Sequence, residues 1–156
     1  MKILFVITLL SILSFSCNNT IKKVNDNEIA IEGTWQLISG TTIEKGDTTV
    51  TDYTKNQNMI KILNATHFSF LNHDLKKGKD STAMFVAGGG RYTLAGDQYT
   101  EYLEYCSARD WEGNTFKFTV TIEGDTLTQR GIEKIENIGV ERLNIEKYTK
   151  VKELKK

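Results

Sequence analysis

The chain has 156 residues, a normal length for one domain, and its 20 basic and 20 acidic side chains balance. This balance excludes the strong positive charge that is typical of a nucleic-acid-binding protein, so we expect no nucleic-acid partner.

The first 17 residues read MKILFVITLLSILSFSC. Lys2 precedes an apolar run from Ile3 to Phe15, which is shorter than the roughly 20 residues that span a bilayer as a helix. This pattern predicts a secretory signal peptide over residues 1–16. The end of the run, with Ser16 before Cys17, resembles the lipoprotein box of bacteria. The resemblance implies that Cys17 carries a lipid and begins the mature chain; the alternative is an ordinary cleaved signal with an incidental cysteine.

The polar residues 17–31 are expected to form a lipidated, flexible tether. We therefore expect a protein of the cell envelope, anchored by lipid to a bacterial membrane at the periplasmic or outer-membrane face. If Cys17 is lipidated, Cys106 is the remaining thiol and is interpreted as a small core residue. The tail 153–156 is basic and predicts a solvated end or a weak contact with anionic lipid.

From Gly33 onward the sequence consists of short segments rich in Thr, Val, Ile, Tyr and Phe, which favour strands. Gly-Asp pairs recur at 46–47, 96–97 and 124–125 and indicate hairpin turns. The expected strands cover 33–43, 58–64, 66–72, 82–87, 90–95, 98–106, 115–123, 126–131 and 138–149. The segment 44–57 looks the most irregular, and Gly88–Gly90 predicts a tight bend of a barrel.

Alternating apolar residues mark the buried faces of several strands. Phe116, Phe118, Val120 and Ile122 share one face, as do Phe68 and Phe70, and as do Ile60 and Ile62. In the segment 98–106 both faces carry aromatic residues, so the inward face stays open there. Many short strands with tight turns predict a meander that closes into a barrel or packs as a sandwich.

The segment Gly33-Thr34-Trp35 resembles the Gly-x-Trp signature at the first strand of lipocalin-like proteins, and later segments (89–94, 99–102, 122–127) resemble small lipocalin-like domains of bacterial lipoproteins. The resemblance implies an all-β, single antiparallel meander barrel over residues 32–152. It also implies that Trp35 plugs one end of the barrel, with a cation across its ring. Arg142 is the expected cation, with Lys150 and Lys152 as alternatives. We expect a monomer.

Side chains that carry chemistry give little support for catalysis. His67 and His73 would lie roughly 20 Å apart on one strand, so we expect no metal site. Glu101 and Glu104 would point to opposite faces of a strand and could not act as a pair. If Glu101 lies inside the barrel, its burial requires a partner such as Arg91. We expect neither a cofactor nor enzymatic activity.

The aromatic residues either fill the core or line a cavity. We hypothesise a non-enzymatic protein that binds a small apolar or amphipathic ligand inside the barrel. The alternative is an envelope protein-interaction or inhibitor module with a packed core, which recognises its partner through loops such as 107–114, where Arg109 and Trp111 would be exposed. The residues expected to bind the ligand are Phe70, Phe85, Tyr92, Tyr99, Glu101, Tyr105 and Phe118.

Overall fold

The protein folds as an antiparallel β-barrel in a computed structural model that describes residues 29–152. The predicted signal peptide, Cys17 and the basic tail lie outside these residues. Eight strands close the barrel, and one further strand, β2 (Asp47–Asp52), extends the sheet beside β1. The barrel strands are β1 (Gly33–Glu44), β3 (Gln57–Leu63), β4 (His67–Asp74), β5 (Phe85–Ala95), β6 (Gln98–Cys106), β7 (Thr115–Glu123), β8 (Thr126–Ile135) and β9 (Val140–Lys150). The predicted all-β meander barrel is thus confirmed.

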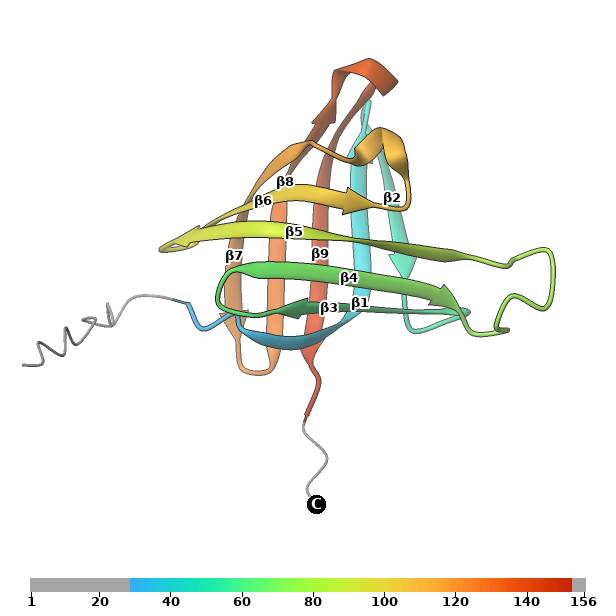
Figure 1. Cartoon of the computed structure of the whole chain (residues 1–156), viewed down its shortest axis with the longest axis horizontal. Helices are drawn as coiled ribbons and strands as arrows, with labels where there is room; N and C mark the ends of the chain where they lie inside the picture. Colours follow the sequence, from blue (N-terminus) through green and yellow to red (C-terminus); the bar gives the residue numbers. More distant parts are fainter. Residues whose placement is uncertain (1–28, 153–156) are drawn as a thin grey trace, which may run out of the picture.

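The first and last strands close the barrel. β1 pairs along most of its length with β9, from Trp35 opposite Lys150 to Ile43 opposite Leu143. Its other edge is shared, because residues 33–36 pair with β3 and residues 39–44 pair with β2. In Figure 1 strands β3 to β6 cross strands β1, β7, β8 and β9 at a large angle, so two differently oriented sets of strands enclose one interior. Every barrel strand therefore has a partner on both sides.

The prediction that 44–57 is irregular is wrong for residues 47–52, which form β2. A turn at Lys45 and Gly46, both with positive φ, joins β1 to β2 in a hairpin. Five of the six residues of β2 are exposed, so its sequence lacks the apolar alternation by which a half-buried strand is recognised.

The glycines at 88–90 do not divide two strands, because β5 runs through them without interruption. A Cβ on Gly90 would lie 1.9 Å from the carbonyl oxygen of Tyr102, so the strands approach there more closely than any side chain allows. The register also changes at this point: Gly89 lies opposite Tyr105, and Gly90 lies opposite Leu103. Glu104 is therefore an extra residue in β6, a β-bulge.

One end of the barrel is filled by an apolar core. Its fully buried side chains include Trp35, Leu37, Val120 and Leu127. The indole of Trp35 donates a hydrogen bond to the carbonyl oxygen of Ile31, 2.8 Å away. The predicted inward faces of β4 and β7 are confirmed, since the inward side chains of both strands pack into or against this core. In β3 the prediction is wrong, as Ile60 and Ile62 face outward while Met59 and Lys61 face the interior.

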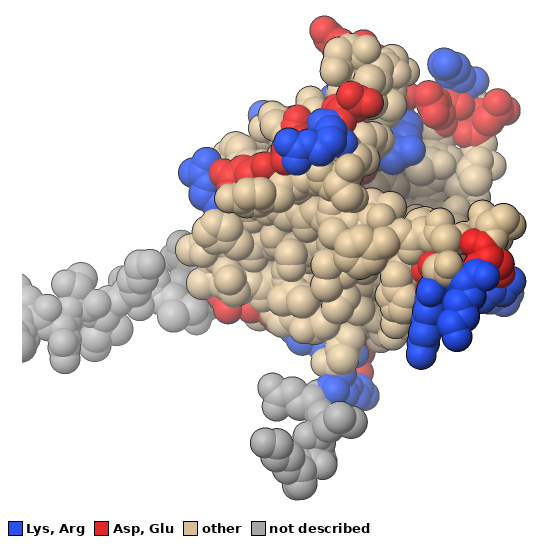
Figure 2. All heavy atoms as spheres, turned by 45° about the vertical axis from the view of Figure 1, so that its right-hand side comes forward, with Lys and Arg blue, Asp and Glu red and all other residues tan. Residues whose placement is uncertain are grey.

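On the face of the molecule shown in Figure 2, most charged side chains lie toward the periphery, around a broad uncharged area. Exposed apolar residues include Leu71, Phe85 and Tyr105. Within residues 29–152, no helix has the length and apolar character needed to cross a membrane.

Candidate ligand-binding cavity

The barrel interior contains a cavity of about 260 Å³. Its position is set by β-strand alternation, which turns every second side chain of the surrounding strands inward. One part of the wall is apolar and aromatic, and the other carries charged and amide groups. The lining residues are Met59, Lys61, Phe70, Val86, Glu101, Leu103, Cys106, Ala108, Trp111, Phe116, Phe118, Gln129, Glu133, Arg142, Glu146 and Tyr148. The cavity is thus amphipathic.

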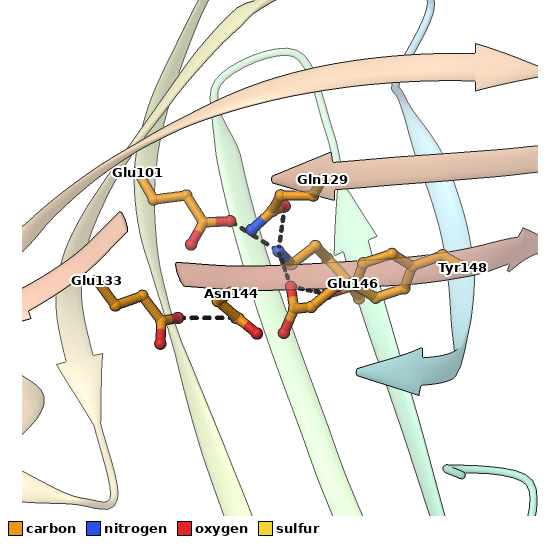
Figure 3. A network of polar contacts seen from close by, with 7 residues as sticks. Glu101, Gln129, Glu133, Asn144, Glu146 and Tyr148 are labelled. Atoms are coloured by element: carbon orange, nitrogen blue, oxygen red, sulfur yellow. Dashed lines mark hydrogen bonds and ion pairs between the residues drawn. The ribbon is translucent and has the colours of Figure 1, made fainter. Parts of the chain in front are cut away.

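Lys61 is the centre of the polar part, where it contacts Glu101, Gln129 and Glu146, which are labelled in Figure 3. Its side chain is only 3% exposed, and its ammonium group donates hydrogen bonds to Glu101 Oε1 at 2.7 Å and to Gln129 Oε1 at 2.8 Å. The same nitrogen lies 5.3–5.9 Å from the ring centroids of Phe68, Tyr99 and Tyr148. Carboxylate, amide and aromatic faces together replace the water that this cation loses on burial.

Glu146 lies on the other side of Lys61. Its Oε2 atom is 4.0 Å from the ammonium nitrogen and accepts a hydrogen bond from the hydroxyl of Tyr148 at 2.7 Å. Burial, followed by the nearby charge of Glu146, raises the pKa of Tyr148 well above its ordinary value. Tyr148 is therefore a neutral hydrogen-bond donor to this carboxylate.

A second polar group is built around Glu133. Its two oxygens accept hydrogen bonds from Asn144 Nδ2 at 3.0 Å and from Arg142 Nε at 2.7 Å. Burial nevertheless raises the pKa of Glu133 above its ordinary value, because the two donors do not fully offset the loss of hydration. The guanidinium group of Arg142 lies over the indole of Trp111, 5.0 Å from the ring centroid. This arrangement links strands β8 and β9 to the loop between β6 and β7.

Trp111 reaches the cavity from the loop 107–114, which contains the short 3-10 helix η1 (Arg109–Trp111). The amide of Gly113 donates to the carbonyl oxygen of Leu103, which holds the loop against the barrel. The indole packs 5.9 Å from the ring of Phe116, and Phe116 in turn packs 6.4 Å from Phe118. These three rings form a continuous aromatic wall. Arg109, in contrast, is exposed and pairs with Glu112.

The structure brings three of the seven predicted ligand-binding residues to the cavity: Phe70, Glu101 and Phe118. Tyr92 and Tyr99 do not line the cavity. Tyr99 is buried and packs between Tyr92 and Phe118, so both tyrosines belong to the apolar core beside the cavity.

For Phe85 and Tyr105 the prediction is wrong, since both are about two-thirds exposed on the outer face. The bulge at Glu104 explains why the side chain of Tyr105 points outward. One extra residue reverses the inward–outward alternation of β6, so that Cys106 faces the interior and Tyr105 faces solvent. In β5 the inward residue is Val86, so its neighbour Phe85 points outward. The prediction that Cys106 is a buried residue is confirmed.

Two predicted pairings are revised. Glu101 pairs with Lys61 and not with Arg91, which lies on the outer face and pairs with Glu104. The cation over Trp35 is not Arg142 but the alternative Lys150, 4.3 Å from the ring centroid, because β1 and β9 place Trp35 and Lys150 directly opposite each other. Lys152 lies beyond β9 and pairs with Asp125.

His67 and His73 lie at opposite ends of β4 and are both exposed. Over residues 29–152, no group of three or more His, Cys, Asp or Glu side chains is arranged to hold a metal ion.

The sequence analysis missed most of the polar wall. Gln129 and Glu133 share the alternation of the buried residues Leu127 and Ile135 in β8. Asn144, Glu146 and Tyr148 likewise share one face of β9. The sequence did contain a signal for this wall: polar residues that keep the two-residue spacing of buried neighbours are expected to face the interior. The signal is stronger when adjacent strands show it together.

The eight-stranded antiparallel barrel is consistent with the predicted lipocalin-like fold. No protein-family model matches this chain, and no curated protein shows significant similarity to it.

Proposed function

We propose that the protein is a lipocalin-like lipoprotein of the bacterial envelope, which binds a small amphipathic molecule inside its barrel without changing it chemically. The observation that carries this proposal is the amphipathic cavity, in which an aromatic wall faces a cluster of buried polar groups. Small-molecule sites have this composition: apolar surface supplies the affinity, and a few polar groups fix the orientation.

The size of the cavity limits the ligand. A volume of about 260 Å³ lies just below the usual range for small-molecule sites, roughly 300–1,000 Å³. The expected ligand is therefore smaller than a typical drug, with its apolar part against Phe70, Phe116 and Phe118 and its polar part toward Glu101 and Glu146.

Extraction of bound molecules tests this function. The full chain is expressed in a bacterial host, purified in a mild nonionic detergent and examined by native mass spectrometry. We expect an added mass that disappears on denaturation. Ala108→Trp places an indole at an exposed position of the cavity wall and should abolish the added mass, whereas Ala95→Trp, at an exposed position remote from the wall, should retain it. An added mass that persists in Ala108→Trp would place the ligand elsewhere.

The lipid anchor is tested separately. The mass of the N-terminal peptide should show acylation at Cys17, and Cys17→Ala should move the protein from the membrane fraction to the aqueous fraction. Cys106→Ala is the matched control, because it removes the other cysteine and should leave the distribution unchanged. An unmodified N-terminal peptide would contradict the anchor and leave the ligand proposal standing.

A further inference from the structure

We propose that the ligand of the cavity is a small organic cation, such as an amine joined to a short apolar or aromatic body. This inference rests on the proposed function and names the ligand class for the same site.

The first support is the charge of the cavity wall. Three carboxyl groups line it, from Glu101, Glu133 and Glu146, against two cationic groups. Glu101 is bonded to Lys61 at 2.7 Å and Glu133 to Arg142 at 2.7 Å. One negative charge therefore has no cation of its own.

Glu146 is the carboxylate in excess (Figure 3). Its distance of 4.0 Å from Lys61 is at the limit of an ion pair, and that ammonium group is already bonded to Glu101 and Gln129. The hydrogen bond that Glu146 accepts comes from the neutral hydroxyl of Tyr148. Its side chain is only 16% exposed, so solvent compensates the charge incompletely. A cationic ligand would supply the missing counter-charge.

The cations of the wall do not offer an equivalent site for an anion. Lys61 is enclosed by its acceptors and three aromatic rings. Arg142 is held by Glu133 and lies over Trp111. An anionic ligand beside either cation would also approach the three carboxylates, and like charges repel strongly where water is scarce.

The aromatic wall is the second, independent support. Trp111, Phe116 and Phe118 form a continuous set of rings on the cavity, and Tyr148 lies beside Glu146. Aromatic faces attract organic cations, as the position of Lys61 among three rings illustrates within this same barrel.

Three probes of matched shape test the ligand class: benzylamine, benzyl alcohol and benzoate. Their binding to the full chain is measured at pH 7 by isothermal titration calorimetry, with protein-free micelles as the blank. We expect benzylamine to bind roughly ten- to a hundredfold tighter than benzyl alcohol, since a hydrogen bond to a charged group contributes about 1.5–3 kcal/mol. Benzoate should bind most weakly.

A carboxylate variant assigns the preference to Glu146. Glu146→Gln keeps an acceptor for Tyr148 and removes the charge, so it should abolish most of the advantage of benzylamine over benzyl alcohol. Glu104→Gln is the matched control, because Glu104 lies on the outer face and pairs with Arg91. If Glu146→Gln does not fold, the ranking of the three probes on the native chain still decides whether the cavity prefers a cationic ligand.

The outcomes separate this inference from the proposed function. Equal binding of benzylamine and benzyl alcohol, or tightest binding of benzoate, would overturn the cationic ligand and leave a binding cavity. If none of the probes bound and no molecule were extracted from the purified protein, both proposals would fail.

Discussion

Lys61 Nζ lies 2.7 Å from Glu101 Oε1, although the two residues are 40 positions apart in the chain. They belong to β3 and β6, which are separated by two strands in the sheet, so the ion pair crosses the barrel interior. Both side chains are almost completely buried. The pair therefore joins distant parts of the barrel by a charged contact in a place where most small domains have only apolar packing.

Lys61→Met should strongly destabilise the protein. Removal of the ammonium group leaves Glu101 buried without its cation, and breaking a buried pair from one side costs about 3–5 kcal/mol. Urea unfolding followed by tryptophan fluorescence measures the loss. Lys117→Met, on the outward face of β7, is the control and should change the free energy of unfolding by less than about 0.5 kcal/mol. Equal effects of the two substitutions would show that the buried pair does not stabilise the barrel.

The cation over Trp35 gives a second prediction. Lys150 lies over the indole ring and donates a hydrogen bond to the carbonyl oxygen of Glu32. Lys150→Met should lower the free energy of unfolding by about 1–2 kcal/mol, because it removes both contacts while keeping an apolar side chain of similar length. Thermal unfolding is the measurement, and Lys152→Met, which removes an exposed pair with Asp125, is the control. A loss no greater than that of the control would contradict a stabilising contact at Trp35.

The fold could be predicted from the sequence because it depends on patterns that extend over many residues. Recurrent Gly-Asp turns and the alternation in β7 both indicate an antiparallel barrel, and each signal survives an error of a few residues in a strand boundary. β2 was missed because nearly all of its residues are exposed and its pattern is polar.

The site was harder to predict because it depends on the direction of single side chains. The bulge at Glu104 reverses the orientation of Tyr105, and no local pattern in the sequence marks it. Lys61 was overlooked because two isoleucines flank it, and hydrophobicity alone assigns those isoleucines to the interior. The interior is polar at this point, so the rule that apolar residues face inward gives the opposite of the observed orientation.

Gly90 tests the close approach of β5 and β6. A Cβ at this position would lie 1.9 Å from the backbone carbonyl oxygen of Tyr102, which cannot move without displacing the strand. Gly90→Ala should therefore cost at least about 3 kcal/mol or prevent folding. Gly40→Ala is the control, since its Cβ would meet only the ring of Tyr53 at 3.0 Å. If chemical denaturation gave equal losses for the two variants, the close approach at Gly90 would not be a constraint on the fold.

Glu133 gives a prediction about pH. Burial raises its pKa in the folded state above the ordinary value of 4.5. Well below pH 4.5 the carboxyl group is protonated in both the folded and the unfolded chain, and it contributes no pH dependence. As the pH rises from 4.5 through the raised pKa, the unfolded chain loses this proton first. The unfolded state is thereby favoured, and the stability contributed by this residue falls.

Glu133→Gln removes this titration while keeping an oxygen that can accept from Asn144. The free energy of unfolding of the variant, relative to the native chain, should therefore increase with pH from about 4.5 toward neutrality. Denaturant unfolding of ligand-free protein at a series of pH values measures this difference. Glu123→Gln, at an exposed position on β7, is the control and should show no such trend. A variant whose relative stability fell as the pH rose would mean that the charge of Glu133, through Arg142, stabilises the fold by more than its burial costs.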